Sequence, residues 1–381
     1  MKLMLSAGEA SGDLHGAALA HEMRLLSPNV ELFGFGGEKM AQAGVRLVHN
    51  YRDYSVMGFW EVLKNLPRLW RLKRDLAAAM QREKPDALLL IDYPDFNWRL
   101  ARVAKSLGIR VLSYIPPSAW AWRKGRAKRC AALAYALIAI FPFELPPYQR
   151  VGARIAFLGN PLLDTVHRTM SEAEARTFFQ VRAEEALVLL LPGSREQEIL
   201  RLLPVMLETA KILQWQRPQT RFFLPLAPSI SRRMVHDMAK AAGISLTLTT
   251  ECTYDLMGMA DFALATSGTV VLEAALMNLP AVVLYRMSPL TYALGRLLVH
   301  VPAFSLPNIL LQEKVEPELL QKEVTPTRIA QEALTLYRGE THREEMVRKL
   351  KAVRPLLGEV GATRRIAQQI LTWTNEVTPS L

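Results

Sequence analysis

Cysteine is scarce in this 381-residue sequence, which contains only Cys130 and Cys252. The two residues lie far apart and belong to no pairing motif, so the sequence predicts neither a disulfide framework nor a cysteine-based metal site. This usage fits a reducing compartment, and we expect a cytoplasmic location.

Long hydrophobic runs are also missing. The longest apolar stretch, residues 130–143, is interrupted by Pro142. It is shorter than the roughly 20 residues that a membrane-spanning helix needs. At the N-terminus the apolar run ends after Leu5, which is too short for the core of a signal peptide. We therefore predict no transmembrane helix and no secretion signal.

Several metal and cofactor motifs have no counterpart in the sequence. Asp-x-Asp, His-Glu-x-x-His and a Walker A run do not occur. The nearest approach to a dinucleotide fingerprint starts at Gly34 and Gly36, but its third glycine would fall at Lys39. We expect no metal, no nicotinamide dinucleotide and no other cofactor.

Acidic residues are outnumbered by basic ones, 36 to 47, which gives a formal net charge of +11. Such a surplus favours an anionic partner, which could be nucleic acid, an anionic membrane surface or a phosphorylated ligand. Charge alone does not choose among these partners.

Short strand-forming runs alternate with helix-length segments along most of the chain, which is the pattern of α/β domains with parallel sheets. The predicted strands are residues 2–7, 30–35, 87–91, 110–115, 136–141, 155–158, 186–191, 221–226, 245–250, 262–265 and 281–285. Two such sets, in a chain longer than one core usually supports, predict two doubly wound domains. We place their boundary near residue 175 and expect the last helix to cross back to the first domain.

Residues 8–13 (Gly-Glu-Ala-Ser-Gly-Asp) follow the first predicted strand and precede a helix. Gly8 and Gly12 allow a tight turn, and Ser11 or Asp13 could cap the helix. A ligand could approach the backbone here, although an ordinary strand-to-helix turn explains the same residues.

Residues 91–97 (Ile-Asp-Tyr-Pro-Asp-Phe-Asn) lie at the carboxyl end of a predicted strand, the edge where open α/β sheets bind ligands. A carboxylate at such an edge can act as a general base if burial holds its pKa near the working pH. Asp95 fits better as the N-cap of a helix that begins near Phe96. Asp92 is therefore our candidate base.

Residues 191–195 (Leu-Pro-Gly-Ser-Arg) end the first predicted strand of the second domain and lead into a helix. Backbone N–H groups and the Arg195 guanidinium converge where a phosphate could bind, and plain helix capping is the alternative. Residues 266–269 (Thr-Ser-Gly-Thr) repeat this arrangement. One helical turn later, Glu273 could bind ribose hydroxyls or could be a solvated helix residue.

Residues 56–80 mix Trp and Leu with Lys and Arg, a composition suited to an interface with anionic lipid headgroups. A second aromatic and basic cluster, residues 120–126, contains Trp120 and Trp122. Such clusters also suit single-stranded nucleic acid, but no RNP, helix-turn-helix or zinc pattern accompanies them. Half of the apolar residues could simply belong to the core.

Six motifs, in this order, resemble those of lipid A disaccharide synthases: residues 8–13, 56–58, 91–97, 118–123, 191–195 and 305–308, with further similarity at 317–321. The resemblance implies a GT-B fold, with two Rossmann-like domains and an interdomain cleft. Residues 1–175 would bind the acceptor and face the membrane, joined by the C-terminal helix 355–381, and residues 176–354 would bind the UDP-sugar. The sequence departs from the family at Asn160, where Gly-His-Pro is usual, and at Leu311-Gln312, where Ala-Gly is typical.

By this resemblance Asp92 is the catalytic aspartate. The implied substrate-binding residues are Glu9, Ser11, Asp13, Met57, Asp95, Asn97, Trp120 and Trp122. The implied donor-binding residues are Gly193, Ser194, Arg195, Ser267, Gly268, Thr269, Arg286 and Asn308, with Glu273 added by analogy to the ribose-binding glutamate of related GT-B enzymes.

The resemblance further implies an inverting transfer of 2,3-diacylglucosamine from UDP-2,3-diacylglucosamine to the 6-hydroxyl of 2,3-diacylglucosamine 1-phosphate, which gives a β-linked disaccharide and UDP. The enzyme would be cytoplasmic and would bind the anionic surface of the inner membrane. We expect no nucleic-acid partner, and a homodimer is possible. The alternatives are another GT-B enzyme, such as a wall N-acetylglucosaminyltransferase or a UDP-sugar epimerase, and a basic nucleic-acid-binding protein.

Overall fold

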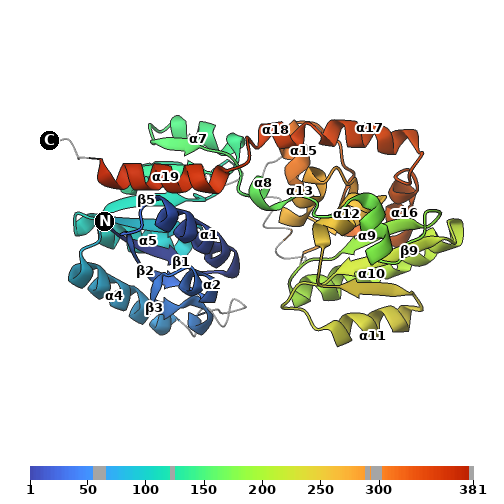
Figure 1. Cartoon of the computed structure of the whole chain (residues 1–381), viewed down its shortest axis with the longest axis horizontal. Coiled ribbons are helices and arrows are strands. Elements are labelled where there is room, and N and C mark those ends of the chain that lie inside the picture. Colours follow the sequence, from blue (N-terminus) through green and yellow to red (C-terminus); the bar gives the residue numbers. More distant parts are fainter. Residues whose placement is uncertain (55–65, 121–124, 288–291, 293–302, 377–381) are drawn as a thin grey trace. The chain divides into compact units, whose positions relative to one another are not determined.

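The computed structural model describes residues 1–54, 66–120, 125–287, 292 and 303–376. The chain divides into two compact units, coloured from blue to red along the sequence in Figure 1. The first unit contains Met1–Pro161 and Leu357–Leu381, and the second contains Leu162–Leu356.

The division falls at Pro161, earlier than the position near residue 175 that we expected from the sequence. The reason lies in the segment that follows Pro161. The backbone N–H groups of Thr169 and Met170 each donate to Asp255 Oδ1 at 2.7 Å. These bonds attach the segment to the second unit, although it contains no strand.

The first unit is built on a seven-stranded parallel sheet of order β3-β2-β1-β4-β5-β6-β7. Its strands are β1 Lys2–Ala7, β2 Glu31–Gly36, β3 Arg46–Asn50, β4 Ala87–Ile91, β5 Arg110–Tyr114, β6 Ala136–Ala139 and β7 Ile155–Phe157. Its α-helices are α1 Ala10–Leu26, α2 Glu38–Gln42, α4 Leu66–Glu83, α5 Pro94–Ser106, α6 Gly125–Leu133, α7 Leu145–Gln149 and α19 Ala362–Asn375.

Helices cover both faces of this sheet, and the sequence of the central strands reflects this. Leu3 and Leu5 of β1 belong to a core cluster that includes residues of α1 and α19. Met4, between them, belongs to a second cluster with residues of α4 and α5. Because β4 is also buried on both faces, Ala87–Ile91 contains no polar residue.

The last helix, α19, drawn in red, packs against α1 (Figure 1). Ile366 and Ile370 of this helix enter the core beside β1. At its C-terminal end, the Arg110 guanidinium donates to the carbonyl oxygens of Thr374 and Glu376 at 2.9 and 2.7 Å. The end of the chain therefore completes the core of the first unit.

The second unit is built on a six-stranded parallel sheet of order β10-β9-β8-β11-β12-β13. Its strands are β8 Ala186–Leu191, β9 Thr220–Pro225, β10 Leu246–Thr249, β11 Phe262–Thr266, β12 Ala281–Tyr285 and β13 Glu318–Leu320. Its α-helices are α8 Leu162–Thr165, α9 Glu172–Phe178, α10 Glu196–Gln216, α11 Arg232–Ala242, α12 Thr253–Met259, α13 Thr269–Leu276, α15 Leu306–Leu311, α16 Pro326–Leu334, α17 Thr341–Leu350 and α18 Val353–Leu356.

In each sheet the strand order reverses beside the first strand of the unit, at β1 and at β8, which confirms two doubly wound α/β units. Every predicted strand is present, with ends shifted by a residue or two. Two strands that were not predicted, β3 and β13, lie at sheet edges. β3 reads Arg-Leu-Val-His-Asn, and β13 has only three residues, so neither gives the apolar run of a central strand.

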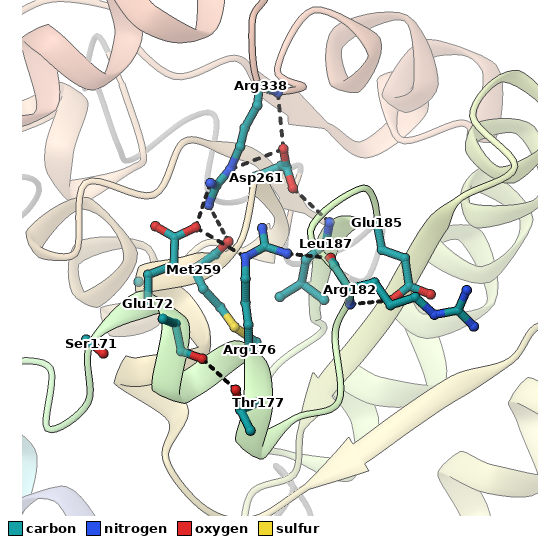
Figure 2. Close-up of polar contacts among 12 residues, drawn as sticks. Ser171, Glu172, Arg176, Thr177, Arg182, Glu185, Leu187, Met259, Asp261 and Arg338 are labelled. Carbon is teal, nitrogen blue, oxygen red and sulfur yellow. Dashed lines mark hydrogen bonds and ion pairs between the residues drawn. The ribbon is translucent and has the colours of Figure 1, made fainter.

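A buried carboxylate ties together the amino ends of β8 and β11 in the second unit (Figure 2). Asp261 is 2% exposed and accepts from the backbone N–H groups of Leu187 at 2.7 Å and Arg338 at 3.1 Å. The Arg338 guanidinium also reaches Glu172 of α9 at 2.7 Å. This network lies at the amino ends of the strands, whereas the predicted donor motifs follow the carboxyl ends.

Candidate active site

The carboxyl ends of β1 and β4 form one edge of the first sheet. Ala7, at the end of β1, pairs with Ile91, at the end of β4, and β2 lies on the other side of β1. Ligands of open α/β sheets bind where the strand order reverses in this way. The structure therefore brings the loop containing Glu9 and the turn containing Asp92 to the same edge.

Asp92 occupies an unusual turn directly after β4. Its φ is +48° and that of Tyr93 is +49°, a region that residues other than glycine rarely adopt. Burial raises the pKa of the half-buried Asp92 carboxyl, and the negative charge of Glu9 raises it further, whereas a hydrogen bond from the Tyr93 backbone opposes the shift. A raised pKa is the property expected of a general base that works near neutral pH.

Asn97 lies behind Asp92 and not at the surface of the site. Its side chain is fully buried. Its Nδ2 donates to the carbonyl oxygens of Asp92 at 2.7 Å and Ser6 at 3.0 Å, and its Oδ1 accepts from the Ser6 hydroxyl at 2.6 Å. Direct contact with substrate, which the resemblance implied, does not fit this burial.

Tyr93 explains why glycine stands at position 8. The Tyr93 ring lies against the backbone of Gly8, and a Cβ there would overlap the ring. The two turns, after β1 and after β4, therefore pack directly on each other. A side chain at position 8 would have to push the turn that carries Asp92 out of place.

Asp13 caps a different helix from the one we predicted. The helix α1 begins at Ala10. Its cap residue is Glu9, whose side chain makes no capping hydrogen bond. Asp13, 2% exposed, instead accepts from the N–H groups of Gly37, Lys39 and Met40 at 2.8, 3.2 and 3.0 Å. Glu9 and Ser11 are exposed at the edge, whereas Asp13 holds α2 in place.

The prediction that Asp95 is an N-cap is wrong. The cap of α5 is Tyr93, and Pro94 takes the first helical position, because the left-handed turn starts the helix earlier than the sequence suggested. The Asp95 side chain is 90% exposed and lies 3.6 Å from the Arg126 guanidinium. Its carboxylate is open to solvent, unlike that of Asp92.

Three aromatic rings follow β5 and β6 at the same edge. Trp120 lies edge-on to Phe143 at a centroid distance of 4.8 Å, and Phe143 stacks on Phe141 at 5.0 Å. All three are half-buried. Trp120 lies at this edge, and its role in substrate binding stays a prediction. Met57 and Trp122 lie outside the described residues.

Glu144 is a buried carboxyl group that the sequence analysis missed. Its Oε2 accepts from the N–H groups of Ile140 and Phe141 at 3.1 Å each. Burial raises its pKa to about 7, against the effect of these two bonds, and the charge of Asp92 adds to the shift. The only signal in the sequence was an acidic residue inside the apolar run Phe-Pro-Phe-Glu-Leu-Pro-Pro.

In the second unit, residues 193–195 link β8 to α10. Gly193 has a φ of +120°, and a Cβ there would overlap the Glu198 side chain. Glu198 Oε2 accepts from the N–H groups of Ser194 and Arg195 at 3.1 and 3.3 Å. These are the groups that we expected to bind phosphate, so a diphosphate would have to displace Glu198. The Arg195 side chain itself is 73% exposed.

The second predicted phosphate turn lies between β11 and α13. Gly268 and Thr269 are exposed, and the cap residue of α13 is Gly268, which has no side chain to cap the helix. Ser267 turns inward, where its hydroxyl donates to the Phe304 carbonyl at 2.9 Å. This turn therefore presents backbone N–H groups more openly than the turn at residues 193–195.

Glu273 is half-buried on α13, so it is not the solvated residue that we considered as an alternative. Burial raises the pKa of its carboxyl, and a hydrogen bond of 3.4 Å from the Tyr254 hydroxyl opposes the shift. Burial and the neighbouring Glu273 raise the pKa of Tyr254 to about 12. The carboxylate is thus held in position as a hydrogen-bond acceptor.

Asn308 supports a loop and is almost completely buried. Its Oδ1 accepts from the N–H groups of Val315 and Glu316 at 2.9 Å each, and its Nδ2 donates to Glu316 O and Glu318 Oε1. The amide is therefore used within the second unit. Arg286 is exposed and donates to the Val324 carbonyl at 2.7 Å.

The two departures from the family pattern have distinct local settings. Asn160 is buried, and its side-chain amide donates to the Ile140 carbonyl at 2.9 Å, which ties the end of the first unit's β7 to the end of β6. Gln312 ends α15 with a φ of +52°, a conformation that glycine adopts without strain. The glycine typical of the family at this position suits that backbone.

Across the described parts of both units, no group of three or more His, Cys, Asp or Glu is arranged to hold a metal ion. Within the same residues, no helix combines the length and the apolar character needed to span a membrane.

Comparison with known proteins gives concordant matches. The sequence pattern of the family described as Lipid-A-disaccharide synthetase matches residues 3–370. A lipid-A-disaccharide synthase from Geobacter metallireducens is 41% identical over 370 residues, which cover 97% of this chain and 96% of the relative.

Among solved structures, a putative UDP-N-acetylglucosamine 2-epimerase from Listeria monocytogenes has a TM-score of 0.67 at 14% identity, covering 99% of this chain and 97% of its own. The calicheamicin glycosyltransferase CalG4 has a TM-score of 0.63 at 13% identity, with 99% of each chain covered. At such low identity these structures show the fold alone, which is the two-unit α/β arrangement of GT-B enzymes.

Proposed function

Since the chain belongs to the lipid-A-disaccharide synthase family, we propose that its first unit binds the sugar acceptor and supplies the base, and that its second unit binds the UDP-sugar donor. The enzyme is a UDP-sugar glycosyltransferase of lipid A synthesis. The full-length match, at residues 3–370, is the observation that carries this conclusion. Its substrates are UDP-2,3-diacylglucosamine and 2,3-diacylglucosamine 1-phosphate, and its products are the β-1,6-linked disaccharide 1-phosphate and UDP.

Asp92 is the general base in this reaction. Inversion at the sugar requires one direct displacement, in which the acceptor 6-hydroxyl attacks the anomeric carbon as its proton leaves. Asp92 lies at the sheet edge where ligands bind, and burial raises its pKa toward the working range. Glu9 and Ser11, which are exposed beside it, and the half-buried Trp120 contact the acceptor in this proposal.

The second unit stabilises the departing UDP. Negative charge grows on the diphosphate as the glycosidic bond breaks, so positive groups that meet it in the transition state increase the rate. The exposed Arg195 guanidinium and the open N-terminus of α13 at Gly268 and Thr269 supply such groups. Glu273, held by Tyr254, accepts the ribose hydroxyls.

Helix α4 binds the membrane that holds the acylated substrates. An open groove of about 660 Å³ runs along it, lined by Pro67, Trp70, Arg71, Lys73, Arg74, Ala77 and Val103. Trp70 is 65% exposed, and the Lys73 ammonium lies 5.7 Å from its ring centroid. An exposed indole among cations suits the interface of an anionic bilayer.

The function is tested by incubating the purified protein with both lipid substrates. The expected result is a disaccharide 1-phosphate and an equimolar amount of UDP. Release of UDP without disaccharide, or an epimerised UDP-sugar, would contradict the proposal. A shift of melting temperature with UDP but not with DNA would separate this function from nucleic-acid binding.

A further inference from the structure

Asn97 forms the centre of a closed hydrogen-bond group behind Asp92. With no exposed surface, it can reach only its neighbours. Its two amide hydrogens point to the carbonyl oxygens of Asp92 and Ser6, with that of Ile91 more distant at 3.4 Å. Its carbonyl oxygen accepts the Ser6 hydroxyl. The donors and the acceptor of this carboxamide are therefore all used inside the protein.

The main target of these bonds is the backbone of Asp92. The Asp92 N–H donates to the Tyr114 carbonyl at 3.1 Å, which continues the pairing of β4 with β5. The Asp92 carbonyl accepts from Asn97 at 2.7 Å. Both main-chain groups of Asp92 are therefore fixed in a backbone conformation with φ at +48°.

We propose that Asn97, itself held by Ser6, is the positioning residue for Asp92. It keeps the turn after β4 left-handed, so that the carboxylate stays directed at the acceptor hydroxyl. This inference rests on the proposed role of Asp92 as the base. In this role Asn97 acts through Asp92 and does not touch substrate.

The residue type at position 97 follows from the partners. The backbone carbonyls need a donor, and the Ser6 hydroxyl needs an acceptor, so a carboxamide satisfies both. A carboxylate at position 97 would place its negative charge against the Asp92 and Ser6 carbonyl oxygens. Alanine would leave the Asp92 carbonyl without this partner, and the turn could relax toward ordinary extended backbone.

The test measures kcat and KM for Asn97→Ala and Ser6→Ala, each alone and combined with Asp92→Asn. We expect Asn97→Ala to lower kcat roughly 10- to 100-fold, because a displacement of about 1 Å can cost as much. The KM for the UDP-sugar should change less than about twofold, since UDP binds the other unit. In the Asp92→Asn background the same substitution should cause no further loss, because no base is left to position.

Ser113→Ala is the matched control. Leu90 of β4 pairs with Ser6 on one side and with Ser113 on the other, so both serines lie at the same level of the sheet. Both are buried, but Ser113 is not a hydrogen-bond partner of Asn97. Ser113→Ala should keep kcat within about twofold of the unchanged enzyme, whereas Ser6→Ala should lower it roughly 3- to 10-fold, as expected for one buried hydrogen bond.

If Asn97→Ala lowers kcat by the same factor in the unchanged enzyme and in the Asp92→Asn variant, the positioning role is refuted and the role of Asp92 is not. Full activity of Asp92→Asn would instead refute the proposed base, and the positioning role with it. Melting temperature and UDP affinity establish that each variant is folded. If Asn97→Ala does not fold, Ser6→Ala decides the question, and a loss no larger than that of Ser113→Ala would refute the proposal.

Discussion

Replacing Asp92 by asparagine is the sharpest test of the mechanism. Asparagine keeps the shape of the side chain and tolerates a φ of +48° better than most residues. The backbone bonds to Tyr114 and Asn97 stay available, so the turn should persist. Only the ability to accept a proton is lost. For a general base this removes roughly 10²- to 10⁴-fold of rate, which corresponds to about 2.7–5.4 kcal/mol of transition-state stabilisation.

The assay is disaccharide formation at saturating donor and acceptor, measured across roughly pH 4 to 9. Burial and the charge of Glu9 raise the pKa of Asp92, so the rate should fall at a higher pH on the acid side than for an ordinary aspartate. The base works only when deprotonated, hence activity is present above its pKa and is lost as the pH falls through it. Glu9→Gln removes one cause of the shift and should move this limb to lower pH.

Asp95→Asn is the control in the same motif. Its carboxylate is 90% exposed, and its ion pair with Arg126 at 3.6 Å is a surface pair worth about 0–1 kcal/mol. The substitution should therefore lower the rate less than about tenfold. If Asp95→Asn were inactive while Asp92→Asn kept its rate, the two roles would have to be exchanged. If both stayed active, neither carboxylate would be the base, and Glu9 and His15 would be tested next.

Four further outcomes are expected. Arg195→Ala should weaken UDP binding about tenfold in calorimetric titration, because a charge-assisted bond to phosphate is lost, and unchanged affinity would move the phosphate site to Gly268 and Thr269. Glu198→Gln should strengthen UDP binding, since its carboxylate occupies the N–H groups of Ser194 and Arg195; weaker binding in the same titration would show that Glu198 supports the site. Flotation with anionic liposomes should decrease with salt and when Arg68, Arg71 and Arg74 of α4 are replaced by Gln together with Lys64, which lies outside the described residues. Undiminished flotation of that variant would refute membrane binding through α4 and the residues before it. Glu316 is fully buried, and burial raises the pKa of its carboxyl although a hydrogen bond from the Ala281 backbone opposes the shift. The folded state therefore loses stability as pH rises above the ordinary range of glutamate, and Glu316→Gln should raise the melting temperature more at about pH 8 than at about pH 5.

The fold class follows from the amino-acid sequence alone, because alternating apolar runs and helix-length segments leave few arrangements other than parallel sheets. The sequence also predicted that Asp92 and Arg195 lie at the ligand-binding edges of the two sheets, since the turns after buried strands gather there. Their roles as base and donor-binding residue stay predictions. The edge strand β3 was not predicted, because an edge strand need not be apolar on both faces.

The partners of the polar residues near these motifs follow from the packing of the folded chain and not from the local sequence. Asn97 could face substrate or backbone, and its partner Ser6 lies 91 positions away in the sequence. Asp13 caps a helix that starts 25 residues later, at Glu38. The side chain of Glu198 occupies a place that the motif alone assigned to phosphate. A local pattern specifies hydrogen-bond donors and acceptors, but the packing of distant segments sets their partners. The contacts of these residues could therefore be identified only from the three-dimensional structure.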